Sequence, residues 1–289
     1  MDRRLALVTG ASAGIGAAFA QVYAAHGWDV ALTARRADRL ERLAEDIRGR
    51  HGAAVLPIAA DLADPAAPRA ILARLADQGR AVDALVNNAG YGVPGHYADT
   101  AWADQGAFLQ VMVTAPCELA HRLVPGMAAR GFGRIVNVAS LAGLAPGGPG
   151  ASLYAASKAF LVRFSESLHL ETRGQGVHVT ALCPGFTWSE FHDVTGSRAR
   201  VARAVPRWAW MSSQDVAAAG YAAVEANRAV CVPGLANQAA ALLARLLPPS
   251  WGLAVMGAQG PGCAGPKGRR APPPPGGSGR WWNRPGRRG

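Results

Sequence analysis

Residues 5–16 read LALVTGASAGIG, and this stretch combines the signals that decide the fold. The apolar run Leu5–Thr9 has the length of a buried strand, and it passes directly into a turn with glycines at positions 10, 14 and 16. Glycines there allow a tight turn, close backbone approach to a pyrophosphate, and close packing of the following helix on the strand. Free N–H groups at the start of that helix would face the phosphate charge. The alternative is a plain connector between a strand and a helix.

Short apolar runs alternate with longer amphipathic segments along the rest of the chain. Parallel strands need crossover connections, so this alternation predicts an α/β doubly wound parallel sheet of about seven strands, with helices on both faces. The expected strands are Leu5–Thr9, Val30–Thr33, Ala54–Ala59, Ala84–Asn87, Arg134–Val138, Val177–Leu182 and Ala229–Val232. The expected helices cover residues 14–26, 38–50, 65–78, 101–130, 154–173 and 213–226, with one more after Pro233-Gly234.

The last 32 residues, 258–289, differ from the rest in composition, with 9 glycines, 7 prolines, seven basic residues and no acid. Such a segment cannot bury enough apolar surface to order itself, so we expect one domain over residues 1–257 and a disordered basic tail. The net charge of +11 depends largely on this tail, because the first 257 residues carry 23 basic and 19 acidic side chains. We therefore expect no nucleic-acid partner. Trp281 and Trp282 among the arginines leave open that the tail contacts a nucleic acid or a membrane surface.

Cysteines and apolar segments bear on the compartment. The four cysteines, at 117, 183, 231 and 263, form no C-x-x-C pair, which favours reduced thiols over a disulfide frame or a metal site. The amino terminus lacks the apolar stretch and cleavage site of a secretory signal. No window reaches the ~18 consecutive apolar residues of a membrane span. We expect a cytoplasmic protein with no membrane span and no metal.

The end of the second expected strand bears on the choice between dinucleotides. An NAD-binding protein normally places an acid there, to accept hydrogen bonds from the adenosine ribose. In LTARRADRL, Ala34 takes that place, and Arg35 and Arg36 follow. Arginine can pair with a 2′-phosphate, which a carboxylate would repel, so the sequence favours NADP(H) over NAD(H). The alternative is that both arginines only extend into solvent.

YAASK, residues 154–158, places a tyrosine and a lysine on one face of an expected helix. Of the 30 basic residues in the chain only Lys158 and Lys267 are lysines, which suggests that position 158 requires an ammonium. A phenol titrates near pH ~10, and a neighbouring ammonium, with the positive ring of oxidised nicotinamide, lowers that pKa. Tyr154 could then exchange a proton with a carbonyl or alcohol oxygen. A surface aromatic beside a solvated charge is the alternative.

Together these segments resemble the short-chain dehydrogenase/reductase family over about residues 3–250. The motifs are TGASAGIG at 9–16, AADL at 59–62, NNAG at 87–90, NVAS at 137–140, YAASK at 154–158 and PG at 184–185, in the family's order. The resemblance is to NADP-dependent carbonyl reductases and secondary alcohol dehydrogenases. It implies a single-domain Rossmann-like fold, hydride transfer between NADP(H) and a carbonyl or secondary alcohol, and a homodimer or homotetramer.

The resemblance also implies roles for individual residues. Ser140 would hydrogen-bond the substrate oxygen, Tyr154 would transfer the proton, and Lys158 would tune Tyr154 and hold the nicotinamide ribose. Ser152 is a weaker candidate for the serine, because it is expected in a loop. Asparagine and glycine also make turns, so NNAG alone leaves cofactor contact open. The implied cofactor-binding residues are Gly10, Ser12, Gly14, Ile15, Gly16, Arg35, Asp61, Leu62, Asn88, Ala89, Gly90, Tyr154, Lys158, Pro184 and Gly185, with Phe186–Ser189 at the carboxamide.

Two departures from the family pattern favour a second interpretation. Met112 stands where the family commonly has an asparagine that supports a water relay from the lysine, and methionine cannot make that hydrogen bond. Ser140 and Tyr154 are also one residue further apart than usual, and the loop APGGPGAS can hold the extra residue. A catalytically weak NADP-binding sensor or scaffold is therefore the alternative function.

Residues 186–212 are the expected substrate lid. The lid contains Trp188, Phe191, Trp208 and Trp210, which favours an apolar carbonyl substrate, although ordinary core packing would explain these residues equally well. We expect His192 and Asp193 at the surface. The sequence leaves the identity of the substrate and the direction of the reaction open.

Overall fold

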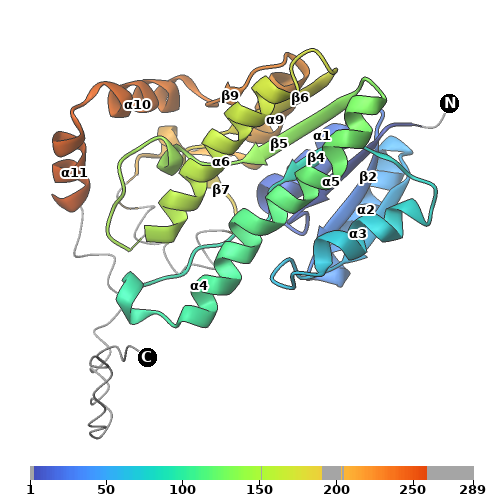
Figure 1. The fold of residues 1–289 in the computed structure, drawn as a ribbon, viewed down its shortest axis with the longest axis horizontal. Coiled ribbons are helices and arrows are strands. Elements are labelled where there is room, and N and C mark those ends of the chain that lie inside the picture. The colour runs from blue at the N-terminus through green and yellow to red at the C-terminus, as the bar shows by residue number, and fades with distance from the viewer. Residues whose placement is uncertain (1–2, 151, 191–202, 204, 259–289) are drawn as a thin grey trace, which may run out of the picture.

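The computed structural model describes residues 3–150, 152–190, 203 and 205–258 (Figure 1). Its centre is a seven-stranded parallel sheet with the strand order β3-β2-β1-β4-β5-β6-β9. The predicted fold class is confirmed, and the ends of the seven predicted strands are right to within two residues. The strands are β1 (Leu5–Thr9), β2 (Asp29–Ala34), β3 (Val55–Ala59), β4 (Val82–Asn87), β5 (Gly133–Val138), β6 (Val177–Leu182) and β9 (Val230–Cys231).

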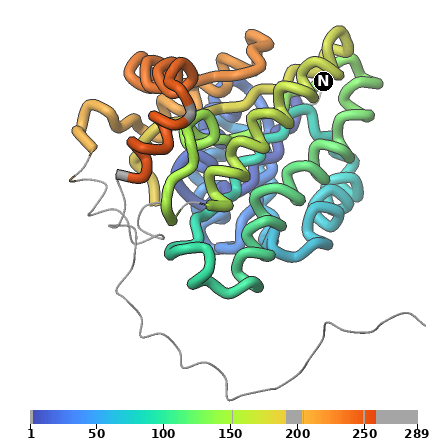
Figure 2. Tube along the Cα trace, turned by 60° about the vertical axis from the view of Figure 1, so that its left-hand side comes forward, coloured from blue at the N-terminus to red at the C-terminus, as the bar shows by residue number. Residues whose placement is uncertain are grey.

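Helices cover both faces of the sheet (Figure 1). One layer contains α1 (Gly14–Ala25), α2 (Ala37–His51) and α9 (Ser213–Glu225). The other contains α3 (Ala67–Ala76), α5 (Ala115–Ala129) and α6 (Ser152–Glu171). The turned view in Figure 2 shows the orange-to-red carboxyl-terminal helices, α10 (Leu235–Leu246) and α11 (Pro249–Ala258), along one side of the molecule.

Successive residues of the central strands belong to the two different layers. Val8 and Val86 pack with α1 and α9, whereas Leu7 and Leu85 pack with α3 and α5, and all four are fully buried. A strand buried on both faces has no polar side to show. These strands therefore read as continuous apolar runs in the sequence.

The order of the strands reverses its direction between β1 and β4. The chain proceeds from β1 through β2 to the edge strand β3, and β4 then pairs with β1 on its other side. The strands β5, β6 and β9 continue to the opposite edge. Open α/β sheets bind ligands at the carboxyl ends of the strands beside such a switch point.

The helix predicted over residues 101–130 is interrupted. It divides into α4 (Trp102–Leu109), a π-helical turn η2 (Gln110–Thr114) and α5. Pro116 has no N–H to donate to the carbonyl of Met112, four residues earlier, so the α-helical ladder breaks there. Turns of this kind are frequent at functional sites.

The carboxyl-terminal part differs from the prediction in two respects. Two helices, α10 and α11, follow Pro233-Gly234 where one was predicted, because Pro248 and Pro249 cannot continue a helix. Two unpredicted two-residue strands, β7 (Thr187–Trp188) and β8 (Met211–Ser212), pair in parallel.

Some predictions fall on residues that the structure does not describe. The predicted tail lies outside the described residues except for Ala258, as do residues 191–202 and 204 of the predicted lid, which include Phe191, His192 and Asp193. Among the helices of the described residues, none combines the length and apolar composition that crossing a membrane requires.

Candidate active site

A cleft of about 560 Å³ lies at the carboxyl ends of the strands, beside the switch point. Its lining comes from the residues at and just after the carboxyl ends of β1 through β6, from the π-helical turn η2 and from the first turns of α6. Two residues of the predicted set do not line the cleft, Gly16 and, in the segment predicted at the carboxamide, Trp188. The predicted residues that do are Gly10, Ser12, Gly14, Ile15, Arg35, Asp61, Leu62, Asn88, Ala89, Gly90, Ser140, Tyr154, Lys158, Pro184 and Gly185, with Phe186, Thr187 and Ser189 of that segment.

The glycine turn needs its glycines for different reasons. Gly10 has φ +65°, a conformation that side-chain-bearing residues rarely adopt, and a Cβ there would lie 2.8 Å from Ala89 Cα. A Cβ at Gly16 would lie 2.4 Å from both Asn88 Nδ2 and the carbonyl oxygen of Gly10. Gly16 therefore lets α1 approach the sheet closely and does not face a ligand.

Asn88 holds the glycine turn in place. Its Nδ2 donates hydrogen bonds to the carbonyl oxygens of Thr9 (2.9 Å) and Gly10 (3.3 Å). The Thr9 hydroxyl in turn accepts from the backbone N–H groups of Asn88 and Ala89 at 2.9 and 3.0 Å. Part of the NNAG motif thus joins the ends of β1 and β4, as the turn interpretation of this motif expects, and the motif also lines the cleft.

Lys158 is buried, with 5% of its surface exposed, and its Nζ donates to the carbonyl oxygen of Val138 at 2.7 Å. Burial lowers its pKa to about 8. The bond ties the first turns of α6 to the end of β5, two residues before Ser140.

Ser140 and Tyr154 both line the cleft, and their side chains lie next to each other. Burial raises the pKa of Tyr154, and a hydrogen bond with the Ser140 side chain opposes that rise. This direction is opposite to the one predicted from Lys158 as a neighbour. Lys158 Nζ lies 5.8 Å from the centroid of the Tyr154 ring and donates to Val138. Ser152, the weaker candidate for the serine, is exposed at the start of α6 and does not line the cleft.

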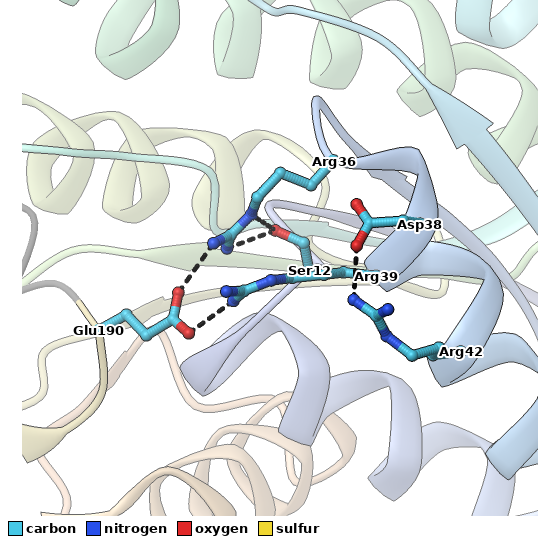
Figure 3. Close-up of polar contacts among 6 residues, drawn as sticks. All are labelled: Ser12, Arg36, Asp38, Arg39, Arg42 and Glu190. Atoms are coloured by element: carbon cyan, nitrogen blue, oxygen red, sulfur yellow. Dashed lines mark hydrogen bonds and ion pairs between the residues drawn. The ribbon is translucent and has the colours of Figure 1, made fainter.

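The end of the cleft beside β2 is basic. Arg35 is exposed and has no hydrogen bond or ion pair with the rest of the described chain. Arg36 is exposed too, but its side chain is held in place: its Nη2 and Nε donate to Ser12 Oγ at 2.9 and 3.3 Å, and its Nη1 pairs with Glu190 at 2.9 Å. Glu190 also pairs with Arg39, as Figure 3 shows. The sequence carries no signal for these pairs, which join residues more than 150 positions apart.

The opposite end of the cleft is largely apolar. Val111, Met112, Leu141 and Phe186 line it, and Met112 is 1% exposed at the centre of the π-helical turn. The thioether of Met112 is at most a weak acceptor. The position that the family uses for a relay asparagine is therefore an apolar contact in this chain.

The aromatic residues of the predicted lid divide between two environments. Phe186 lines the cleft. Trp210 is 7% exposed and stacks on Trp188, with ring centroids 4.2 Å apart. Trp208 is 75% exposed. Of the four predicted rings, Trp188, Trp208 and Trp210 do not line the cleft, and Phe191 lies outside the described residues. Packing therefore accounts for Trp188 and Trp210, and the ring that lines the cleft, Phe186, is not one of the four.

Metal-binding side chains are not clustered in the described parts of the chain. In residues 3–150, 152–190, 203 and 205–258, no three His, Cys, Asp or Glu side chains lie together in a way that could hold a metal ion. The three cysteines in these ranges are free thiols.

A doubly wound parallel sheet with a glycine turn and a cleft at its switch point defines a dinucleotide-binding α/β protein. Residues 4–199 match the family model described as short chain dehydrogenase. The chain belongs to the short-chain dehydrogenase/reductase family, and it is an NAD(P)-dependent oxidoreductase acting on alcohol or carbonyl substrates.

Relatives with known names and structures agree with this membership. A sulfoacetaldehyde reductase of Chromohalobacter salexigens is 40% identical over 186 residues, which is 64% of this chain and 72% of that protein. A short-chain dehydrogenase from Sphingobium yanoikuyae, solved in complex with NADPH, superposes with a TM-score of 0.74 at 33% identity. The match covers 83% of this chain and 91% of that protein. The bulky-bulky ketone specific alcohol dehydrogenase from Comamonas testosteroni superposes with a TM-score of 0.70 at 28% identity. The match covers 86% of this chain and 96% of that protein.

Proposed function

We propose that this enzyme transfers a hydride between NADP(H) and an apolar carbonyl compound or secondary alcohol, with Ser140, Tyr154 and Lys158 as its catalytic residues. The observation that carries the proposal is the placement of these three side chains in the same cleft as the glycine turn, with Ser140 hydrogen-bonded to Tyr154. NADPH, when bound, supplies the hydride.

The cleft fits an anionic dinucleotide. Its volume is within the range of ligand sites, and the glycine turn lines it where backbone would approach a pyrophosphate. One end of the cleft carries Arg35 and Arg36, and position 34 is an alanine where NAD-binding proteins normally have an acid. Both features support NADP(H) as the cofactor. The complex of the Sphingobium relative with NADPH supports the same choice.

The residues of the chain divide the remaining work. Tyr154 donates its phenolic proton to the substrate oxygen as the carbonyl carbon gains a hydride, and takes a proton back in the reverse reaction. Ser140 hydrogen-bonds the same oxygen and stabilises the charge that develops on it. Lys158 fixes the first turns of α6 through Val138 and has further N–H groups to donate to a ribose hydroxyl.

The apolar end of the cleft supports the substrate class. Val111, Met112, Leu141 and Phe186 offer little polar surface to a substrate held there. The name of the Comamonas relative, which is specific for bulky ketones, points in the same direction.

Met112 supports a second candidate, a weakly catalytic NADP-binding sensor or scaffold. It is buried where the relay asparagine would stand, so the route by which Lys158 is reprotonated has one polar group fewer. Binding of NADPH without oxidation across a panel of ketones would favour this candidate.

The experiment that tests the proposal is NADPH oxidation with aromatic and aliphatic ketones, run beside NADH. Tyr154→Phe is expected to lower kcat by about 10²–10⁴, because it removes the proton donor and keeps the ring. Tyr97→Phe is the matched control, since Tyr97 is exposed and does not line the cleft. Equal turnover by Tyr154→Phe and the parent would refute the assignment of the proton donor.

The domain boundary, assembly and location of the enzyme are also proposals. We propose one domain over residues 1–257 and a homodimer or homotetramer, supported by family resemblance and by the exposed Leu242, Leu243 and Leu246 on α10. The free thiols support a cytoplasmic location. Light scattering on the full chain measures the assembly.

A further inference from the structure

Glu190 ties the segment after β6 to the start of α2. Its Oε2 accepts a hydrogen bond from Arg36 Nη1 at 2.9 Å, and its Oε1 accepts one from Arg39 Nη1 at 2.5 Å (Figure 3). Arg36 directly precedes α2, and Arg39 lies in the first turn of that helix. The carboxylate therefore bridges both guanidinium groups.

This ion-pair cluster, formed by Glu190, Arg36 and Arg39, lies at the basic end of the cleft. Arg36 and Glu190 line the cleft together with Ser12 and Arg35. Nε and Nη2 of Arg36 donate to Ser12, and Nη1 donates to Glu190, so each nitrogen of this guanidinium already has an acceptor. Three of the five N–H groups of this guanidinium are thus engaged, and a new anion that pairs with Arg36 either displaces Ser12 or Glu190 or binds the remaining N–H groups beside the Glu190 carboxylate.

The neighbouring ion pair on α2 lies outside the cleft. Arg42 pairs with Asp38, its neighbour four residues earlier, and both side chains are about two-thirds exposed. Neither residue lines the cleft. Asp38 is thus a carboxylate on the same helix that neutralises an arginine without reaching the ligand site.

We propose that Glu190 is a specificity-determining residue that competes with the adenosine 2′-phosphate of NADP(H) for Arg36 and Arg39. This inference rests on the proposed use of NADP(H). A carboxylate and a phosphate monoester pair with guanidinium in the same way, and they repel each other. NAD(H) carries a hydroxyl in place of the phosphate and leaves the ion pairs intact. Glu190 therefore lowers the preference for NADP(H) over NAD(H) below the value that the arginines alone would give.

The charge state and exposure of the cluster set the size of the effect. Hydrogen bonds from Arg39 and Arg36 lower the pKa of Glu190, so it is ionised throughout the neutral range. The Glu190 side chain is 41% exposed, so water and salt screen its pairs. An ion pair of this kind changes an equilibrium constant by about fivefold at most.

The test compares the full-length parent with Glu190→Gln and Asp38→Asn. Both variants remove one negative charge from the same region, but only the first acts in the cleft. The probes are adenosine 2′,5′-bisphosphate and 5′-AMP, which differ only in the 2′-phosphate, followed by NADPH and NADH. Titration calorimetry gives the dissociation constants.

We expect Glu190→Gln to bind the bisphosphate and NADPH about fivefold more tightly, with 5′-AMP and NADH within twofold of the parent. Asp38→Asn should resemble the parent, and raised salt should shrink the Glu190→Gln effect.

Five results would overturn the inference. Weaker NADPH binding by Glu190→Gln would mean that Glu190 positions the arginines. An equal gain for NADPH and NADH would mean that it acts on the part common to both dinucleotides. An equal gain in affinity in Asp38→Asn would mean that the effect comes from net charge alone.

If neither the parent nor Glu190→Gln distinguishes the bisphosphate from 5′-AMP, the NADP(H) assignment itself fails. If only the shift between the two proteins is missing, the role of Glu190 fails alone.

Discussion

Lys158 occupies a position where its positive charge is unfavourable. It is buried against β5 and its pKa falls to about 8, whereas an unfolded chain gives lysine a pKa near ~10.4. Below pH 8 the folded protein therefore bears the full cost of a buried ammonium. That cost disappears as pH rises, because the unfolded chain then binds more protons than the folded one. Perturbed pKa values of this kind cluster at functional sites.

A Lys158→Met variant separates the effect of Lys158 on stability from its effect on activity. We expect it to lose activity and to keep its fold, because methionine fills similar space without a charge. Between about pH 8 and pH ~10.4 the stability of the parent should rise relative to that of the variant. Urea unfolding at pH 7, 8, 9 and 10 measures the difference. A difference that does not change with pH would contradict the lowered pKa.

The element scale shows which parts of the fold can be predicted from sequence. The strands are predictable because burial on both faces makes them largely apolar runs, as in Leu5–Thr9. The strands β7 and β8 have two residues each and no pattern to detect. The break at Met112 depends on a missing hydrogen bond from Pro116, a signal that is present in the sequence but outweighed there by the long amphipathic pattern.

The paired strands β7 and β8 depend on the stacked tryptophans. Trp210 is nearly buried against Trp188 and Phe186, so Trp210→Ala should cost about 3–5 kcal/mol in the free energy of unfolding. Trp208, two residues away and 75% exposed, is the matched control and should change it by less than about 0.5 kcal/mol. Denaturant unfolding of both variants gives the comparison. Equal losses would show that the stack does not hold this pair of strands.

At the scale of the whole molecule, the sequence places the cleft but not every residue that shapes it. The ends of parallel strands meet at one edge of the sheet, so motifs after β1, β4 and β5 fall together once the strand order is known. The bridge from Glu190 to Arg36 and Arg39 depends on how distant segments pack, and no local pattern encodes it. The single domain and the tail remain predictions.

Truncation tests whether the basic tail contributes to the reaction. Every predicted catalytic and cofactor-binding residue lies before residue 190, so a chain ending at Ala258 should keep kcat and KM within twofold of the parent. Steady-state assays on the full and truncated chains decide the matter. Loss of turnover, with circular dichroism unchanged, would favour a role for the tail in binding a membrane or nucleic acid.

The short helix η3 (Leu141–Gly143) follows Ser140 and runs against α6. A methyl group at Gly143 would come within 2.6–2.8 Å of main-chain atoms of Lys158 and Ala159, and main chain in a helix cannot yield. Position 143 therefore acts as a spacer that fixes how far the serine stands from the tyrosine. A deep mutational scan should find position 143 as intolerant of substitution as the predicted catalytic positions, although the residue touches no reactant. Nearby Gly147 has open space around it and should accept replacement.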